Sequence, residues 1–360
     1  MKEILLQIPH FQWFYRFGMP RRLPMNLTVS LLYACNSRCK TCNVWKKKAR
    51  NLTLEEYDKT FRSLGRHPYW ITLSGGEPFL RTDIAEICAL ACRHCRPRIV
   101  NIPTNGLLTE KIQQNLPRIL EACPCAEVVV NLSLDQIGTR HDEIRGVPGN
   151  YEKAMRTYGV LKEIKRRYPK LTIGIHTVIS NYNVDDFPAI YEELMRLEPD
   201  SYITEIAEER VELDTLGTGI TPSLEKYTQA IDFLILKMKA QKCVGLARIA
   251  RAFRLRYYEL VKQTLARREQ VLPCYAGVAS AQIAPDGDVW ACCVRAEPLG
   301  NLRDVDYDFA KIWRGAKADA MRRSIKNKEC CCPLANAGYT NMLMHAPTLW
   351  RVGLNLLARK

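Results

Sequence analysis

Three cysteines near the amino end have the spacing of a metal-binding loop. Cys35, Cys39 and Cys42 are separated by three and then by two residues, and they follow an apolar run that predicts a strand. Three thiolates can bind three irons of a 4Fe–4S cube and leave the fourth iron open. Because an open metal position is what a substrate or cofactor needs, the spacing predicts a catalytic iron–sulfur cluster.

Two other interpretations of these three cysteines stay open at this point. A zinc site needs four ligands, and no fourth Cys or His lies nearby in the sequence. Buried cysteines without a metal are the second alternative, although three of them in one polar loop would be unusual.

A second triplet, Cys88, Cys92 and Cys95, repeats the same spacing. It lies on a predicted helix, where this spacing puts the three side chains on one face, as in any core stripe. We therefore predict that these cysteines pack in the core, and that Cys123 and Cys125 are structural as well.

Polar residues and glycines end the next three predicted strands. The second strand ends in Gly-Gly-Glu-Pro, where the glycines let the backbone approach a ligand closely and the glutamate adds an acceptor. Polar groups at the ends of the third and fourth strands can hydrogen-bond the hydroxyls of a ribose. The candidate binding residues are Gly75, Gly76, Glu77, Thr104, Asn105, Ser133 and Asp135.

The elements that must position these residues alternate regularly between 26 and 215. Short apolar runs are followed by amphipathic helical stretches, and six strand-then-helix units predict a parallel sheet with right-handed crossovers. Such sheets carry their reactive groups at the carboxyl ends of the strands, where the motifs fall. The predicted strands are 27–33, 70–75, 98–106, 127–135, 171–180 and 201–207.

On its CxxxCxxC loop and its Gly-Gly-Glu-Pro segment, the chain resembles the radical S-adenosylmethionine (SAM) superfamily. One departure is Thr41, because many members have an aromatic residue before the last cysteine. The resemblance implies a 4Fe–4S cluster on the first triplet and SAM as cofactor. It implies that 74–78 binds the amino group of SAM, that Ser133 and Asp135 lie near its ribose and methionyl part, and that Arg145 pairs with its carboxylate.

The resemblance also implies a mechanism. The reduced cluster passes one electron into SAM, and the resulting 5′-deoxyadenosyl radical takes a hydrogen atom from the substrate. A reductant such as flavodoxin or ferredoxin is implied as a partner. No catalytic side chain is assigned, although His176, Asn183 and Glu205 are expected near the pocket; for His176 the alternative is a satisfied core histidine.

The C-terminal part has a different composition, with six cysteines between 271 and 335. Pro285-Asp-Gly-Asp is a hairpin signal that would return Cys292 beside Cys274. This part resembles the SPASM or Twitch domains of radical SAM enzymes, which implies an auxiliary 4Fe–4S cluster. Our predicted ligands are Cys274, Cys292, Cys330 and Cys332, with Cys293 or Cys331 as substitutes and a four-cysteine zinc site as the alternative.

The expected fold class is α/β, a partial (β/α)6 TIM-like barrel with a small C-terminal cysteine-rich iron–sulfur module. The expected segments are an N-terminal amphipathic extension 1–25, a radical SAM core 26–215, a helical linker 216–270, an auxiliary-cluster domain 271–335 and a C-terminal amphipathic segment 336–360.

Charge and composition bear on partners and location. The net charge is +15, but no nucleic-acid-binding motif accompanies it. The amino end has no secretory signal pattern, so we expect a cytoplasmic protein. Aromatic and basic residues at both ends of the chain are compatible with helices packed on the barrel or with peripheral contact to an anionic membrane.

The substrate is not specified by the sequence. Relatives with such modules modify peptides, proteins and sugars, and a lipid-linked molecule follows if the membrane interpretation holds. The first 25 residues leave no room for a peptide-recognition domain, which argues against a peptide maturase. The rival interpretation is a non-catalytic iron–sulfur electron-transfer or scaffold protein, which explains the cysteines but not the motifs at the ends of the second and fourth strands.

Overall fold

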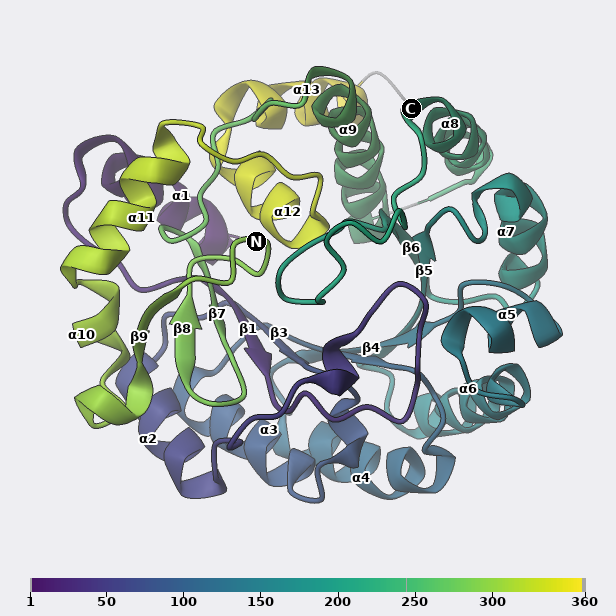
Figure 1. Cartoon of the computed structure of the whole chain (residues 1–360), viewed down its shortest axis with the longest axis horizontal. Coiled ribbons are helices and arrows are strands. Elements are labelled where there is room, and N and C mark those ends of the chain that lie inside the picture. Colours follow the sequence, from purple (N-terminus) through teal and green to yellow (C-terminus); the bar gives the residue numbers. More distant parts are fainter. Residues whose placement is uncertain (1, 244, 358–360) are drawn as a thin grey trace.

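A nine-stranded curved sheet organises residues 2–243 and 245–357, which the computed structural model describes (Figure 1). Its order is β6-β5-β4-β3-β2-β1-β7-β8-β9. Strands β1 to β7 pair in parallel, β8 pairs antiparallel with β7, and β9 pairs antiparallel with β8. The strands are β1 (Asn26–Ser30), β2 (Trp70–Ser74), β3 (Ile99–Thr104), β4 (Glu127–Ser133), β5 (Leu171–Ile179), β6 (Ser201–Ile206), β7 (Ser280–Ile283), β8 (Asp288–Trp290) and β9 (Pro298–Asn301).

Helices follow each of the first six strands and cover the outside of the curved sheet (Figure 1). This order confirms the α/β class and the partial (β/α)6 barrel. The helices are α1 (Lys2–Phe17), α2 (Leu54–Leu64), α3 (Ile84–Cys95), α4 (Thr109–Ala122), α5 (Gly138–Arg145), α6 (Asn150–Arg167), α7 (Phe187–Met195), α8 (Leu224–Ala240), α9 (Gly245–Arg267), α10 (Phe309–Trp313), α11 (Ala316–Lys326), α12 (Ala335–Met344) and α13 (Ala346–Leu357).

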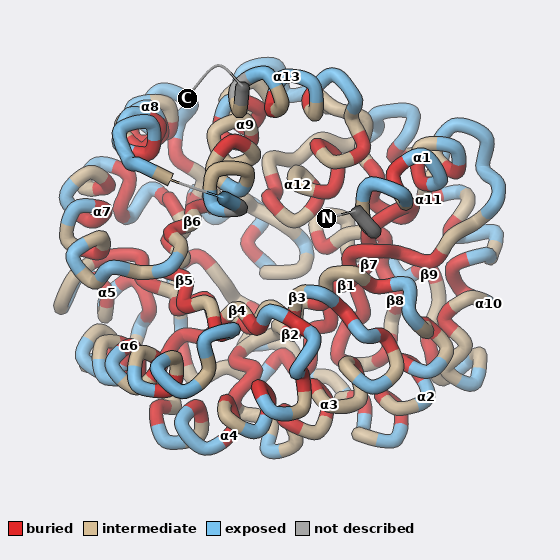
Figure 2. The backbone as a smooth tube through the Cα atoms, turned by 180° about the vertical axis from the view of Figure 1, so that it is seen from behind, coloured by how far each residue is buried: buried red, intermediate tan, exposed pale blue. Residues whose placement is uncertain are grey.

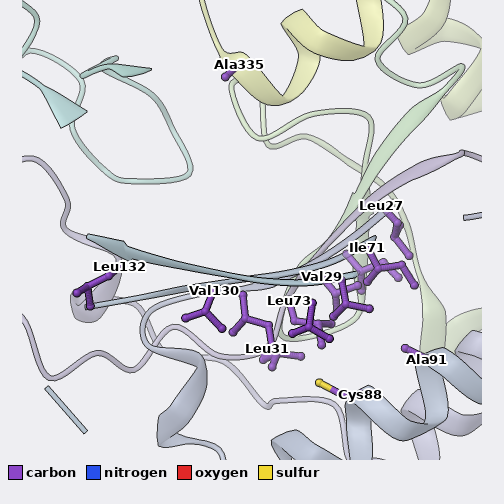
Figure 3. Packing of buried hydrophobic residues seen from close by; sticks show 14 of the residues in the cluster. Leu27, Val29, Leu31, Ile71, Leu73, Cys88, Ala91, Val130, Leu132 and Ala335 are labelled. Atoms are coloured by element: carbon purple, nitrogen blue, oxygen red, sulfur yellow. The ribbon is translucent and has the colours of Figure 1, made fainter. Parts of the chain in front are cut away.

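The core lies between the sheet and its helices. Leu27, Val29 and Leu31 alternate along β1 and are fully buried, together with Cys88 and Ala91 of α3 (Figure 3). Buried residues follow the strands and the inward faces of the helices, whereas the outer helical faces are exposed (Figure 2). Because strand side chains alternate between the two faces of a sheet, the same strands that build this core present their other side chains to the barrel interior.

The C-terminal part continues the barrel sheet. Strand β7 pairs in parallel with β1, from Asn26 opposite Ser280 to Val29 opposite Ile283. The predicted hairpin joins β7 to β8, and Gly287 in its turn has φ +91°, a conformation that favours glycine. Cys274 therefore precedes, and Cys292 follows, strands that belong to the barrel sheet.

An ion pair ties the C-terminal part to the barrel helix α2. Thr53 and Glu56 form a capping box at the amino end of α2. Arg303 also donates to both carboxylate oxygens of Glu56, at 2.7 and 3.0 Å, and the Tyr307 hydroxyl donates at 2.7 Å. Burial opposes the ionisation of Glu56, but these hydrogen bonds outweigh it and lower the pKa of Glu56 to about 2.

We expect Glu56→Gln to lower the free energy of unfolding by about 1–3 kcal/mol at pH 7, because it leaves Arg303 without its anion. The pKa of Glu56 falls from an ordinary 4.5 to about 2 on folding. The stabilisation is therefore complete above pH 4.5 and is lost as the pH falls through about 2. Denaturant titrations of the apoprotein, followed by circular dichroism, should show the difference between wild type and variant shrinking across that window.

The exposed neighbour Glu55 provides the matched control. It pairs only with Lys59 at the surface, at 3.2 Å, and such pairs contribute little. Glu55→Gln should therefore unfold like the wild type, and an equal loss in both variants would contradict the role given to Glu56.

Candidate functional site

A pocket opens at the carboxyl ends of β1 to β6. All eleven residues that the sequence singled out for the first cluster and for SAM line it. They are Cys35, Cys39, Cys42, Gly75, Gly76, Glu77, Thr104, Asn105, Ser133, Asp135 and Arg145. They lie at or just after the ends of β1, β2, β3 and β4, with Arg145 at the end of α5, so the parallel topology has brought them together.

The three thiols of the first triplet are free and partly buried. Their loop is fixed by backbone bonds to the end of α5: the Arg38 amide donates to the Arg145 carbonyl at 2.9 Å and the Lys40 amide to the Ile144 carbonyl at 2.8 Å. Burial raises the pKa of Cys35 to about 11 and that of Cys42 to about 12. Because such thiols ionise only beside strong positive charge, they suit metal binding better than free nucleophilic chemistry.

Gly75 and Gly76 allow the loop after β2 to lie directly on the loop after β1. Gly75 has φ +129°, and a Cβ at Gly76 would overlap the backbone carbonyl of Ala34. The Gly76 amide donates to the Leu32 carbonyl at 2.7 Å. The glycines are thus required by the contact between two loops, and this contact brings the Gly-Gly-Glu-Pro segment beside the cysteine loop.

Glu77 is 1% exposed, and its carboxylate forms hydrogen bonds within the protein. One oxygen accepts from the Phe79 amide at 3.1 Å and from the Thr104 hydroxyl at 2.9 Å, and the other accepts from the Asn105 amide at 2.8 Å. Burial raises the pKa of Glu77 to about 7 against these hydrogen bonds. Its side chain therefore braces the end of β2 against the end of β3.

A buried ion pair crosses the pocket floor. Arg145 lies 2.9 Å from the Asp135 carboxylate, and its other terminal nitrogen lies 3.7 Å from the Cys39 sulfur. Burial disfavours the charge of Arg145, but Asp135, Cys39 and Cys35 raise its pKa above the ordinary value. Among the atoms the structure describes, the buried Nε of Arg145 has no hydrogen-bond partner, so one N–H of a fixed cation remains for a ligand.

The pocket wall formed by β5, β6 and the segment after β6 was predicted only in part. His176 and Glu205 line it as predicted, 4.0 Å apart, whereas Glu208 and Arg210 were missed. They follow β6 in an irregular segment, and the only signal was their place after the sixth strand. Burial raises the pKa of Glu208 to about 7. Asn183 lies behind the wall, where its amide donates to the Asp135 carbonyl at 2.8 Å.

A second pocket gathers the C-terminal cysteines. Its lining includes all four predicted ligands, Cys274, Cys292, Cys330 and Cys332, and also Cys331. Cys293 is not part of this lining; it is buried elsewhere, and burial raises its pKa well above the ordinary value. Within residues 2–243 and 245–357, no three His, Cys, Asp or Glu side chains are arranged to hold a single metal ion.

The second triplet has the expected role only in part. Cys88 and Cys95 are buried in the core, as predicted. Cys92, however, forms a disulfide with Cys123, with their Cα atoms 5.6 Å apart. Cys125 is exposed, so its predicted structural role is wrong. The sequence carries no local signal for this pairing, since the two bonded cysteines are 31 residues apart.

Comparisons with known proteins agree with this geometry. The sequence matches the radical SAM superfamily over 29–194 and SPASM, an iron-sulfur cluster-binding domain, over 274–333. Pre-heme d1 synthase of Dinoroseobacter shibae is 32% identical over 172 residues, which are 47% of this chain and 39% of that protein. Mycofactocin maturase MftC of Mycobacterium ulcerans is 24% identical over 326 residues, 86% of this chain and 79% of that protein.

A solved structure has the same fold. SuiB of Streptococcus suis, bound to S-adenosylmethionine, superposes with a TM-score of 0.61 at 16% identity, covering 86% of this chain and 70% of that one. SuiB has also been solved bound to its precursor peptide SuiA.

Proposed function

Because the chain carries a radical SAM domain followed by a SPASM domain, we propose that it cleaves SAM reductively and uses the 5′-deoxyadenosyl radical to remove hydrogen from a substrate. Proteins similar to it are enzymes, among them maturases and AdoMet-dependent heme synthases. A radical SAM domain implies a 4Fe–4S cluster and SAM, and a SPASM domain implies auxiliary iron–sulfur clusters.

The observation that carries the proposal is the convergence of three free thiols and an incompletely paired arginine in one pocket. The thiols of Cys35, Cys39 and Cys42 fit a cluster with one open iron, and the buried Nε of Arg145 fits an anionic group such as the SAM carboxylate. When bound, the cluster supplies the electron that splits SAM into methionine and the radical.

The chain's own residues bind SAM and orient it in the pocket. In this proposal the backbone of 74–76 receives the amino group of SAM, and Ser133, Asp135, Thr104 and Asn105 line its ribose and methionyl part. Asp135 holds Arg145 in place through the 2.9 Å ion pair. Glu77 keeps two strand ends together, so its contribution is to position the loops.

We assign the wall formed by β5, β6 and the segment after β6 to the substrate. His176, Glu205, Glu208 and Arg210 line the pocket beyond the SAM-binding motifs. Among the described atoms, the buried His176 Nε2 and one oxygen of Glu208 have no hydrogen-bond partner. Polar groups left unpaired at a pocket wall favour a substrate that presents hydrogen-bonding groups of its own. This wall suits the peptide, protein, sugar or lipid-linked substrates expected from the sequence.

The auxiliary cluster and the partners complete the proposal. Cys274, Cys292, Cys330 and Cys332 are the proposed ligands of one auxiliary 4Fe–4S cluster, and their common pocket supports this set. A flavodoxin or ferredoxin supplies electrons. We propose that the protein works in the cytoplasm, with peripheral contact to a membrane surface. None of the helices in the described chain is long and apolar enough to cross a bilayer.

The test is production of 5′-deoxyadenosine. The chain should be reconstituted with iron and sulfide without oxygen, reduced with dithionite and incubated with SAM. We expect 5′-deoxyadenosine and methionine in equal amounts, and neither product from a Cys35→Ala variant. Protein with a full complement of iron that leaves SAM intact would favour the rival function, a non-catalytic iron–sulfur electron-transfer or scaffold protein.

A further inference from the structure

Helix α1 is apolar on two opposite faces. Ile8, Phe11 and Phe14 are buried in a cluster with residues of the C-terminal part. The other face exposes Trp13, whose side chain is 57% exposed, and Leu6, which is 72% exposed. The exposed apolar side chains of this face, which continues one turn beyond the helix, are Leu5, Leu6, Trp13, Phe17 and Met19. The cluster with the C-terminal part covers one apolar face of α1 and leaves these side chains in contact with solvent.

Helix α11, which contacts α1, carries several exposed basic side chains. Helix α11 lies beside α1 (Figures 1 and 2), where Arg21 pairs with Asp319 at 2.6 Å and the Lys326 amine donates to the Arg16 carbonyl at 3.1 Å. Asp319 also pairs with Arg322. The exposed basic residues of α1, α11 and the turn that follows are Arg16, Lys317, Arg323, Lys326 and Lys328, against one exposed acid in that turn, Glu329.

Helix α13 also has exposed apolar side chains. Leu349 packs against the same cluster as the buried face of α1, and the Gln12 side chain donates to the Met344 carbonyl at 2.8 Å. On its outer side α13 exposes Trp350, at 70%, and Leu354. Helices near the two ends of the chain therefore contact the same buried cluster, and each also exposes a tryptophan and aliphatic side chains.

We propose that this surface, which we call the α1–α11 face, docks on an anionic lipid bilayer. The inference rests on the peripheral membrane contact proposed above, and it specifies the helices that make this contact and the negative charge of the lipid. Tryptophan favours the boundary between headgroups and acyl chains, and lysine and arginine beside it are attracted to anionic headgroups. A second copy of the chain is a poorer occupant, because a two-fold interface would bring the same basic residues together.

The experiment is co-sedimentation of the full reconstituted protein with vesicles. Vesicles of phosphatidylcholine with 40% phosphatidylglycerol should bind the protein at low salt, and binding should weaken at high salt. Pure phosphatidylcholine vesicles should bind it at least about tenfold more weakly. Trp13→Ser combined with Phe17→Ser should weaken binding by about tenfold or more, as should the triple change Lys317→Gln, Arg323→Gln and Lys328→Gln.

Matched controls distinguish docking by this surface from nonspecific binding of the protein to vesicles. Leu236 on α8 is 71% exposed, so Leu236→Ser removes an equally exposed side chain from a helix that is not part of the face. Lys153, Arg156 and Arg167 on α6 are exposed, so their change to Gln removes the same charge elsewhere. Both control variants should bind like the wild type.

Three results would overturn the proposal. The first is no binding to the anionic vesicles at low salt. The second is an equal loss of vesicle binding in the control variants. The third is a concentration-dependent dimer that forms without lipid and that the Trp13 and Phe17 changes dissociate. SAM cleavage measured on the same samples should be unchanged in every variant. Failure of docking is thereby distinguished from failure of the proposed function.

Discussion

Replacing Cys39 with alanine is expected to lower the rate of SAM cleavage by more than about a hundredfold, since even partners one shell beyond a metal ligand change activity by 10–100-fold. The Cys39 thiol is partly buried, and its sulfur lies 3.7 Å from the Arg145 guanidinium. The remaining pair of thiols leaves a second iron of the cube without a protein ligand. Quantification of 5′-deoxyadenosine in dithionite-reduced samples measures the loss.

Iron analysis of the same samples shows which cluster the variant has lost. Two 4Fe–4S clusters correspond to about eight irons per wild-type chain, so the Cys39→Ala variant should retain about four, in the auxiliary cluster. If the C-terminal cysteines instead hold zinc, the wild type would contain about four irons and one zinc. A Cys39→Ala variant that keeps all its iron would contradict the assignment of Cys39 as a ligand.

Cys95 provides the matched control, because it closes the other CxxxCxxC triplet. It is buried in the core, where its thiol donates to the Phe61 carbonyl at 3.6 Å. Cys95→Ala should cost some stability through a small cavity but should leave both iron content and SAM cleavage unchanged. Loss of iron in this variant would mean that the two triplets had been assigned the wrong way round.

The site could be predicted where its residues lie at the ends of regular strands. Ser74, Thr104 and Ser133 end β2, β3 and β4, and parallel pairing with right-handed crossovers brings such positions to one edge of a sheet. Hydrophobic periodicity was sufficient to find those strands. The fold and the motif residues therefore followed from local patterns together with one topological rule.

The remaining features depend on contacts between segments that carry no regular pattern. Glu208 and Arg210 reach the pocket from an irregular stretch after β6, and the pairing of Cys92 with Cys123 depends on how α3 packs against the end of α4. The sequence also did not predict that the Glu77 carboxylate accepts hydrogen bonds from within the protein. Its three donors come from the loops after β2 and β3, whose mutual approach is set by tertiary packing.

Gly76→Ala is expected to have the largest effect of any change that adds a single methyl group to the site. The new Cβ would overlap the carbonyl oxygen of Ala34, a backbone atom that cannot rotate away. The loop after β2 must then move off the cysteine loop, and a displacement of about 1 Å at a catalytic site can cost about a hundredfold in rate. We therefore expect SAM binding and SAM cleavage to fall together.

Gly159→Ala is the control that separates this effect from a general consequence of the substitution. A Cβ at Gly159 meets nothing within 4 Å, and alanine is favoured over glycine inside a helix by about 1 kcal/mol. This variant should be slightly more stable than the wild type and fully active. Equilibrium dialysis with labelled SAM and the 5′-deoxyadenosine assay measure the two steps. If Gly76→Ala bound and cleaved SAM like Gly159→Ala, the two loops would have to tolerate separation, and the close approach would not be what positions the cofactor.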